Sequence, residues 1–281
     1  MKIIHKIPEM QKITKKLHSA NKTIGLVPTM GALHGGHISL IQRARKENDC
    51  VIVSIFVNPT QFGPNEDYLR YPRPFNKDVR MCKKYGVNYV FAPTPKEMYD
   101  INHLSYVTVE KLSNILCGEF RQGHFRGVTT VVTKLFNITQ PDRAYFGEKD
   151  YQQLMIIQKM VNDLNFPVKI IPCPTIREND GLALSSRNLC LSKNERIRAG
   201  KIYRILLRVK KLFHEKKLLS ADKIVNYIKN EIRRVPGLRI QYVKICNSKT
   251  LDEIKGKLYS PARILIAVWD GKTRLIDNIE I

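Results

Sequence analysis

The stretch Thr23-Ile-Gly-Leu-Val-Pro-Thr-Met-Gly-Ala-Leu-His-Gly-Gly-His37 decides the fold class of this chain. Its first residues form a short apolar run that is typical of a buried strand, and glycines follow at once. Apolar residues then recur at helical spacing, at Ile38, Leu40, Ile41 and Ala44. The order of strand, glycine-rich turn and helix predicts the first crossover of an α/β sheet.

Further apolar runs alternate with helical patterns along the next hundred residues. The expected strands cover residues 51–57, 88–92, 143–147 and 168–171. The expected helices cover residues 75–85 and 129–138. This alternation predicts a doubly wound parallel sheet, in which ligands gather at the carboxyl ends of the strands. The long loop from Asn58 to about Pro74 follows one such strand and is a candidate functional loop.

The pattern changes near residue 175. Two basic amphipathic helices are expected at 193–216 and 221–234, and strands at 240–245 and 263–269. Pro236-Gly237 separates the second helix from these strands. A chain of 281 residues has room for two cores. We therefore expect an α/β domain over residues 1–175 and a smaller α+β domain over residues 176–281.

The composition is that of a folded protein with a large excess of positive charge. The formal net charge is +23, and 43% of the residues are hydrophobic, which argues against disorder. The apolar runs are far shorter than the roughly 20 residues that cross a bilayer, and the amino terminus does not resemble a signal peptide. We expect no membrane segment and a cytoplasmic location.

The six cysteines and the many lysines suggest no separate chemistry. The cysteines lie too far apart for a zinc site or a redox pair, which favours reduced thiols and assigns no metal ligands. Basic pairs such as Lys15-Lys16 and Lys216-Lys217 are spread between apolar positions. A solvated basic surface is therefore favoured over specific nucleic-acid binding, and an RNA-binding module remains the alternative.

Two histidines lie at the glycine-rich turn that opens the first helix. Backbone N–H groups and the positive helix end point outward at such a turn, and imidazoles add hydrogen bonds to a bound phosphate. Isolated histidines at this spacing would more often be surface or capping residues, but their position after a strand favours a phosphate site. The candidate residues are Met30, Gly31, Ala32, Leu33, His34, Gly35, Gly36 and His37.

A second polar segment lies about 150 residues further on. It comprises Leu184, Ser185, Ser186 and Arg187, and it offers two hydroxyls and a guanidinium in a stretch without periodicity. Arginine suits phosphate because its N–H groups form a fork that matches two oxygens. Ser-Ser-Arg alone is a common surface tripeptide. Together with the histidines, it predicts a mobile loop that closes over the same polyphosphate.

These two segments resemble the signatures of the nucleotidyltransferase superfamily. Over essentially its whole length, the chain resembles the pantothenate synthetases, which are also called pantoate–β-alanine ligases. The resemblance rests on Pro28-Thr-Met-Gly-Ala-Leu-His34 with Gly36-His37, Ser54-Ile-Phe-Val-Asn-Pro-Thr-Gln-Phe62, Gly123-His-Phe-Arg-Gly-Val128, Phe146-Gly-Glu-Lys-Asp-Tyr-Gln-Gln153 and Ser185-Ser-Arg-Asn188. Five such blocks in the same order make a chance match improbable.

The resemblance implies ATP-dependent condensation of pantoate with β-alanine, through an enzyme-bound pantoyl adenylate. The products are pantothenate, AMP and pyrophosphate, and Mg²⁺ accompanies ATP. The resemblance also implies a Rossmann-like domain that binds nucleotide and pantoate, a small carboxyl-terminal lid domain and a cytoplasmic homodimer. The substrates supply both nucleophiles, so the protein would contribute positioning and charge stabilisation.

The resemblance further implies roles for particular residues. His34, His37 and Lys149 are the expected catalytic residues, with His37 as proton donor to the leaving group. The expected nucleotide contacts, besides the two segments above, are Gly147, Glu148, Lys149, Asp150 and Ile176. The expected substrate amides are Gln61 and Gln153 for pantoate, with Gln61 also meeting β-alanine and Asn58 a weaker candidate. Two positions depart from the usual pattern. Leu184 replaces a methionine of similar volume, and we expect a small effect. Gln122 replaces a proline, a change that would loosen the loop but removes no chemical group.

A different nucleotidyltransferase, which adenylylates a phosphate acceptor, is the nearest enzymatic alternative. Gln61 and Gln153, within their extended motifs, argue against it.

Overall fold

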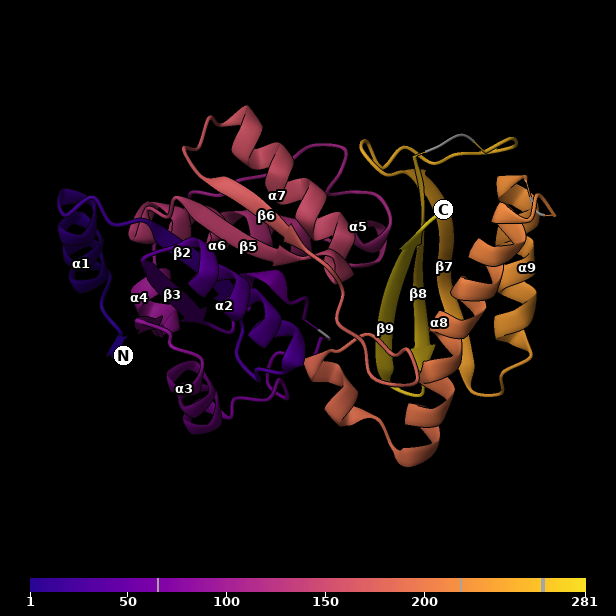
Figure 1. Ribbon diagram of the computed structural model, residues 1–281, viewed down its shortest axis with the longest axis horizontal. Coiled ribbons are helices and arrows are strands. Elements are labelled where there is room, and N and C mark those ends of the chain that lie inside the picture. The colour runs from indigo at the N-terminus through magenta and orange to yellow at the C-terminus, as the bar shows by residue number, and fades with distance from the viewer. Residues whose placement is uncertain (65, 218, 259–260) are drawn as a thin grey trace. The chain divides into compact units, whose positions relative to one another are not determined.

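The computed structural model describes residues 1–64, 66–217, 219–258 and 261–281 (Figure 1). The chain forms two compact units. The first unit comprises Met1–Glu148 and Ile156–Pro174, and the second comprises Lys149–Met155 and Thr175–Ile281. The short segment Lys149–Met155 therefore packs with the carboxyl-terminal part of the chain, although it follows a strand of the first unit.

The first unit is built on a six-stranded sheet in the order β1-β4-β3-β2-β5-β6, in which every neighbouring pair is parallel. Its strands are β1 Lys2–Ile4, β2 Ile24–Thr29, β3 Cys50–Ile55, β4 Tyr89–Phe91, β5 Arg143–Gly147 and β6 Lys169–Cys173. The predicted doubly wound parallel sheet is confirmed. From β2 the chain moves outward through β3 and β4 in one direction, and through β5 and β6 in the other. Ligands of such sheets bind where the strand order reverses, at the carboxyl ends of β2 and β5.

Helices cover this sheet because its strands are apolar on both faces. Val51, Ile52 and Val53 in β3 are fully buried. The helices of the amino-terminal half are α1 Ile7–Ser19, α2 Gly35–Glu47, α3 Phe75–Lys84, α4 Pro95–Met98, α5 Cys117–Phe120, α6 His124–Thr139 and α7 Tyr151–Asp163. Helix α2 packs across β2, β3 and β5, whereas α1 packs against α6. Strand β1 and helices α1 and α7 were not predicted from the sequence.

Helix α6 begins at His124, five residues before the predicted start at 129. Its first turns contain Gly127, which interrupts the apolar pattern and therefore hides the helix from a search for periodicity. A Cβ at Gly127 would lie 2.4 Å from the carbonyl oxygen of Thr60 and 2.6 Å from the nitrogen of Gln61. The glycine thus lets the loop after β3 pack directly on the helix.

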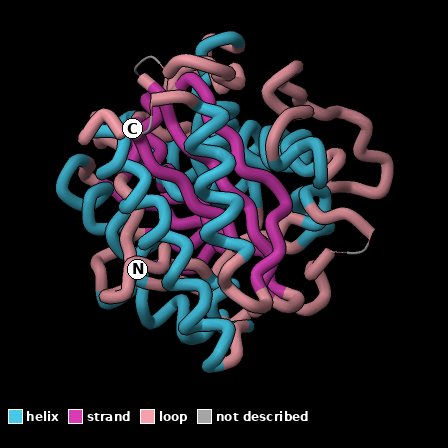
Figure 2. The backbone as a smooth tube through the Cα atoms, turned by 90° about the vertical axis from the view of Figure 1, so that its right-hand side faces the viewer, coloured by secondary structure: helices cyan, strands magenta, loops and turns pink. Residues whose placement is uncertain are grey.

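The second unit contains a three-stranded antiparallel sheet in the order β7-β8-β9. Its strands are β7 Leu238–Asn247, β8 Ala262–Asp270 and β9 Thr273–Glu280, and its helices are α8 Lys193–His214 and α9 Ala221–Arg233. Figure 2 shows the long strands with helices packed against them, and the shared core includes Leu206, Ile228 and Ile266. Strand β9 was not predicted from the sequence, because polar Asp277 and Asn278 interrupt its apolar alternation although both are buried.

Cys50 and Cys246 are buried, as expected for small apolar side chains, and burial raises the pKa of the Cys50 thiol to about 11. Within the described ranges, no helix has the length and apolar character that crossing a membrane requires.

Candidate active site

The loop that leaves β2 is held by a buried acid from helix α3. The carboxylate of Asp78, only 1% exposed, accepts hydrogen bonds from the backbone N–H groups of Ala32 and Leu33, each at 2.8 Å. Gly31 and Ala32 have φ of 81° and 50°, so the chain turns sharply here. Burial raises the pKa of Asp78, although the two N–H donors act in the opposite direction.

Sequence reasoning missed Asp78. No motif contains it, but one signal was available: it is an acidic residue on the apolar side of a short amphipathic helix, where charge is rarely buried without a specific partner.

His34 and His37 form a reciprocal cap at the first turn of α2. Nδ1 of His34 accepts from the backbone N–H of Gly36 at 3.2 Å, and Nδ1 of His37 accepts from the backbone N–H of His34 at 3.3 Å. The two ring centroids are 4.1 Å apart. A nitrogen that accepts carries no proton, so each neutral ring carries its proton on Nε2. The histidines are therefore capping residues whose other nitrogen is a hydrogen-bond donor.

The substrate candidate Gln61 lies in the short 3₁₀ helix Pro59–Gln61 that follows β3. Its Oε1 accepts from Nδ2 of Asn58 at 3.1 Å, and its Nε2 donates to Sδ of Met30 at 3.0 Å. The structure thus brings together three predicted site residues from the loops that follow two adjacent strands.

Asn58 is 1% exposed, and its amide is used to fix this loop. Its Oδ1 accepts from the hydroxyl of Tyr99 at 2.8 Å and from Oγ1 of Thr60 at 3.0 Å. Its Nδ2 donates to the carbonyl oxygen of Gly127 at 3.0 Å as well as to Gln61. These bonds occupy both ends of the amide, so Asn58 orients Gln61 within the protein.

A second network, formed by His124, Arg121 and Glu66, holds the backbone of Gln61. Nδ1 of His124 lies 2.8 Å from the carbonyl oxygen of Gln61, and Nε2 lies 3.1 Å from Nη1 of Arg121. The guanidinium of Arg121 also donates to both carboxylate oxygens of Glu66, at 2.7 and 2.5 Å. His124 must donate to a carbonyl and accept from a cation, so its ring is neutral with the proton on Nδ1.

Strand β5 ends at Gly147, beside the residues predicted to meet the nucleotide. A Cβ at Gly147 would meet no described atom within 4 Å, so the backbone is accessible there. Lys149 and Asp150 follow in a 3₁₀ turn, with Nζ and Oδ2 3.9 Å apart. The carbonyl oxygen of Lys149 accepts from Nδ2 of Asn278 in β9 at 3.0 Å. Gln153, half-buried, lies in the first turn of α7.

The predicted nucleotide segment of the second unit forms a hairpin. The backbone N–H of Leu184 donates to the carbonyl oxygen of Ile176 at 2.9 Å, and Arg177 pairs with Ala183. The guanidinium of Arg177 binds both carboxylate oxygens of Asp277, at 2.7 and 2.8 Å, and stacks on Tyr203.

The predicted phosphate residues continue directly from this hairpin. Oγ of Ser185 accepts from the backbone N–H of Arg187 at 3.3 Å and caps the short 3₁₀ helix Ser186–Cys190. The hairpin thus brings Ile176 beside Leu184, and the cap orders the tripeptide that follows.

Each unit therefore gathers its own set of predicted residues. The first unit carries Met30 to His37, Asn58, Gln61, Gly147 and Glu148, and the second carries Lys149, Asp150, Gln153, Ile176 and Leu184 to Arg187. Among the described residues, no group of three His, Cys, Asp or Glu side chains could hold a metal ion.

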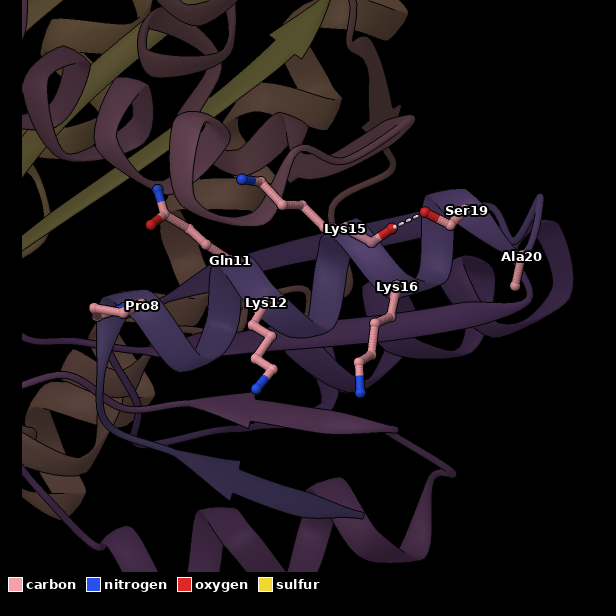
Figure 3. Close-up of a pocket in the computed structure, with 7 residues that line it drawn as sticks. All are labelled: Pro8, Gln11, Lys12, Lys15, Lys16, Ser19 and Ala20. Carbon is pink, nitrogen blue, oxygen red and sulfur yellow. Dashed lines mark hydrogen bonds between the residues drawn. The ribbon is translucent and has the colours of Figure 1, made fainter.

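A surface hollow on helix α1 is unrelated to these residues. Its lining consists of Pro8, Gln11, Lys12, Lys15, Lys16, Ser19 and Ala20 (Figure 3). The three lysines project from the exposed side of one helix, and none of the predicted site residues contributes to it.

The fold and the loop after β2 define the class of this protein. A parallel sheet whose strand order reverses beside a glycine-rich turn and a helix N-terminus belongs to the Rossmann-like α/β proteins, in which such turns face bound phosphate. Comparison with known proteins identifies the family. A sequence profile described as pantoate-β-alanine ligase matches residues 2–280, and the chain belongs to this family.

Individual relatives agree with the family assignment. The pantothenate synthetase of Thermosipho africanus is 51% identical over 284 residues, and the match covers 100% of this chain and 100% of that protein. The pantothenate synthetase of Clostridium novyi is 53% identical over 275 residues, and the match covers 98% of this chain and 96% of that protein. The structure of pantothenate synthetase from Thermus thermophilus matches with a TM-score of 0.93 and 43% sequence identity. The match covers 100% of this chain and 99% of the Thermus thermophilus chain.

A structure of pantoate-β-alanine ligase from Francisella tularensis, complexed with β-γ ATP and β-alanine, has a TM-score of 0.83 and 42% identity. The match covers 100% of this chain and 97% of the Francisella tularensis chain. The predicted family and the Rossmann-like fold are thereby confirmed.

Proposed function

We propose that this protein is an ATP-dependent pantoate–β-alanine ligase. Pantoate's carboxylate attacks the α-phosphorus of ATP and forms pantoyl adenylate with release of pyrophosphate. The amine of β-alanine then attacks the activated acyl carbon, and pantothenate and AMP leave. The observation that carries this proposal is the His34–His37 cap at the carboxyl end of β2, in a chain that belongs to the ligase family over nearly its whole length.

His34 and His37 contact the phosphates of ATP in this proposal. Nδ1 of each ring accepts a hydrogen bond in the cap, so each neutral ring carries its N–H on Nε2, and in this proposal that group donates to a phosphate oxygen. His37 stabilises the charge that develops on the departing pyrophosphate, and the N-terminus of α2 adds the field of its backbone N–H groups. The fixed Nδ1 atoms hold the rings in place, so little reorganisation accompanies the reaction.

Gln61 and Gln153 bind pantoate in this proposal, and Gln61 also meets β-alanine. A neutral amide can both donate to a carboxylate and accept from a hydroxyl, which suits a hydroxy acid. The bonds from Asn58 and His124 to Gln61 support this role, because they fix its side chain and its backbone. Asn58 then contributes to the pantoate site by orienting Gln61.

Lys149 neutralises phosphate charge, and Gly147, Glu148 and Asp150 meet the nucleotide. Ile176 contacts adenine, and Leu184, Ser185, Ser186 and Arg187 close over the phosphates. In this proposal residues 1–175 form the nucleotide- and pantoate-binding domain, and residues 176–281 form a lid. The hairpin bond between Ile176 and Leu184 supports a shared role for the two ends of that segment.

Mg²⁺ accompanies ATP in this proposal. Mg²⁺ typically keeps several waters and is bound through substrate phosphates with one or two carboxylates, so a protein cage is not required. Asp150 is the carboxylate that fits this mode, because it is half-exposed and follows the open strand end at Gly147. The ion would supply charge neutralisation to the phosphates.

We also propose a cytoplasmic homodimer. The first unit exposes large apolar side chains at Ile101, Leu104 and Tyr106, with 99%, 87% and 43% of their surface accessible. Exposed apolar side chains this close together are typical of protein interfaces. Sedimentation equilibrium of the full chain measures the mass directly, and a monomer at micromolar concentration would contradict the dimer.

Substrate-dependent pyrophosphate release tests the reaction itself. The purified chain with ATP, Mg²⁺ and pantoate should release pyrophosphate, and added β-alanine should yield pantothenate and AMP. Release that requires nicotinamide mononucleotide, and does not occur with pantoate, would overturn the proposal in favour of another nucleotidyltransferase. Salt-sensitive RNA binding that competes with ATP would favour the nucleic-acid alternative.

A further inference from the structure

We propose that strand β9 positions both nucleotide-binding segments of the second unit, through the adjacent residues Asp277 and Asn278. The inference rests on the proposed function. Each acts through another residue and not on a substrate directly, Asp277 through Arg177 and Asn278 through Lys149. They are therefore positioning residues.

Asn278 fixes the backbone at Lys149. Its Nδ2 donates to the carbonyl oxygen of Lys149 at 3.0 Å, and its Oδ1 accepts from Nη1 of Arg263 at 2.6 Å. Arg263 in turn stacks on Tyr151, with its guanidinium carbon 3.9 Å from the ring centroid. The same short segment is thus held at its first residue by an amide and at its third by a cation, and Asn278 connects the two.

Asp277 fixes the hairpin that carries Ile176 and Leu184. Its carboxylate, 6% exposed, forms two parallel bonds with the guanidinium of Arg177. Such paired bonds define the orientation of both groups as well as their distance. Arg177 also donates to the carbonyl oxygen of Gly181 at 3.0 Å, so it fixes the far end of the hairpin too.

One strand can support both segments because successive side chains of a strand point to opposite faces. Asp277 and Asn278 are neighbours, and both are buried. Oδ1 of Asp277 also accepts from the backbone N–H of Asn278 at 2.8 Å. Two segments that begin 27 residues apart in sequence, at 149 and 176, therefore share one rigid support.

Asn278→Ala tests the first contact. We expect kcat for pantoate-dependent pyrophosphate release to fall about tenfold, with the KM for pantoate changed less than about twofold, because one hydrogen bond that positions Lys149 is lost. Asn278→Asp should lose as much, since its carboxylate keeps an acceptor for Arg263 but has no N–H for the Lys149 carbonyl. Recovery of full turnover by Asn278→Asp would overturn the positioning role.

Glu280→Gln is the matched control. Glu280 accepts from Nη2 of the same Arg263 at 2.8 Å, and 57% of its side chain is exposed. The turnover of Glu280→Gln should stay within about twofold of the wild type, because an exposed ion pair contributes little to stability. A loss equal to that of Asn278→Ala would assign the effect to Arg263 and overturn the inference.

A double-mutant cycle separates positioning from general damage. In a Lys149→Ala background, Asn278→Ala should change the residual turnover less than about twofold, because the group it positions is already gone. An equal tenfold loss in both backgrounds would overturn the inference. Asp277→Asn should instead raise the KM for ATP several-fold, and an unchanged KM would remove Asp277 from the proposal.

The wild-type measurement keeps the two proposals distinct. If the wild type released no pyrophosphate with pantoate, the proposed function would fail. If it did, and the Asn278 variants matched it, only the role of β9 would fail.

Discussion

The buried carboxylate of Asp78 accepts a hydrogen bond of 2.8 Å from the backbone N–H of Leu33, so an acid of helix α3 sets the loop that precedes the two histidines. A second bond of the same length goes to Ala32. The loop has left-handed backbone at two successive residues, a conformation that needs such support. The proposed phosphate site therefore depends on a residue that lies outside every recognisable motif.

Asp78→Asn should destabilise the protein and slow the adenylation step. Asparagine offers one acceptor in place of two, and its NH₂ group would face a backbone N–H. We expect the free energy of unfolding to fall by about 1 to 3 kcal/mol, measured by urea titration. Arg80→Gln, at an exposed position of the same helix, is the control and should be neutral.

The difference in unfolding free energy between the wild type and Asp78→Asn should depend on pH, which gives an independent check. The folded-state pKa of Asp78 is raised, so the unfolded chain releases this proton at lower pH than the folded protein does. The stability contributed by Asp78 is therefore fullest below its unfolded pKa and declines as pH rises through the folded pKa. The free energy of unfolding of the wild type should exceed that of Asp78→Asn by less at neutral pH than at acidic pH. A difference that increases over that interval would contradict the assigned effect of burial.

Mutation can separate two functions of His37, namely capping of helix α2 and the proposed binding of phosphate. Glutamine is a common partner in such caps, so His37→Gln should keep the bond to the backbone N–H of His34 and preserve stability. It lacks the ring Nε2–H, and turnover should fall roughly 10² to 10³-fold. His37→Ala should lose the same turnover and also about 1 kcal/mol of stability. Thermal unfolding and pyrophosphate release measure the two effects, and an active His37→Gln enzyme would remove the histidine from the chemistry.

Gly127→Ala should disturb the substrate loop without touching substrate. The added Cβ would lie within 2.6 Å of backbone atoms of Thr60 and Gln61, which cannot move as a side chain could. We expect about 1 to 3 kcal/mol of destabilisation and weaker pantoate binding. Gly147→Ala is the opposite case: open space surrounds its added Cβ among the described atoms, so stability should hold while nucleotide binding weakens. Equal stability losses in the two variants would contradict this packing.

Gln153→Ala should raise the KM for pantoate and leave the KM for ATP close to that of the wild type. Removing the amide leaves hydroxyls of bound pantoate unpaired, which costs about 1 to 3 kcal/mol. Initial rates of pyrophosphate release at varied pantoate and varied ATP separate the two constants. Selective loss of ATP saturation would show that Gln153 has been assigned to the wrong substrate.

Much of the fold follows from local sequence. The strand, glycine turn and helix at residues 23–44, and the apolar runs of β3 and β5, predicted the parallel sheet because period and turn chemistry are local properties. Five motif blocks in the same order, the first of them within this segment, indicated the family. The elements that were missed, such as β9 and α7, carry polar residues whose burial depends on partners far away in the sequence, so their patterns look irregular in isolation.

The sequence by itself determined the fold class, the family and the residue types of the candidate site, because these depend on spacing and chemistry along the chain. Only the tertiary structure decided which groups support the site. Asp78 holds the histidine loop, His124 and Asn58 hold Gln61, and Asp277 with Asn278 hold Arg177 and Lys149. All of these contacts except the one between Asn58 and Gln61 join residues that are distant in sequence. Such hydrogen bonds form only in the folded chain, where water is excluded and a buried polar group bonds to the partner that lies within reach.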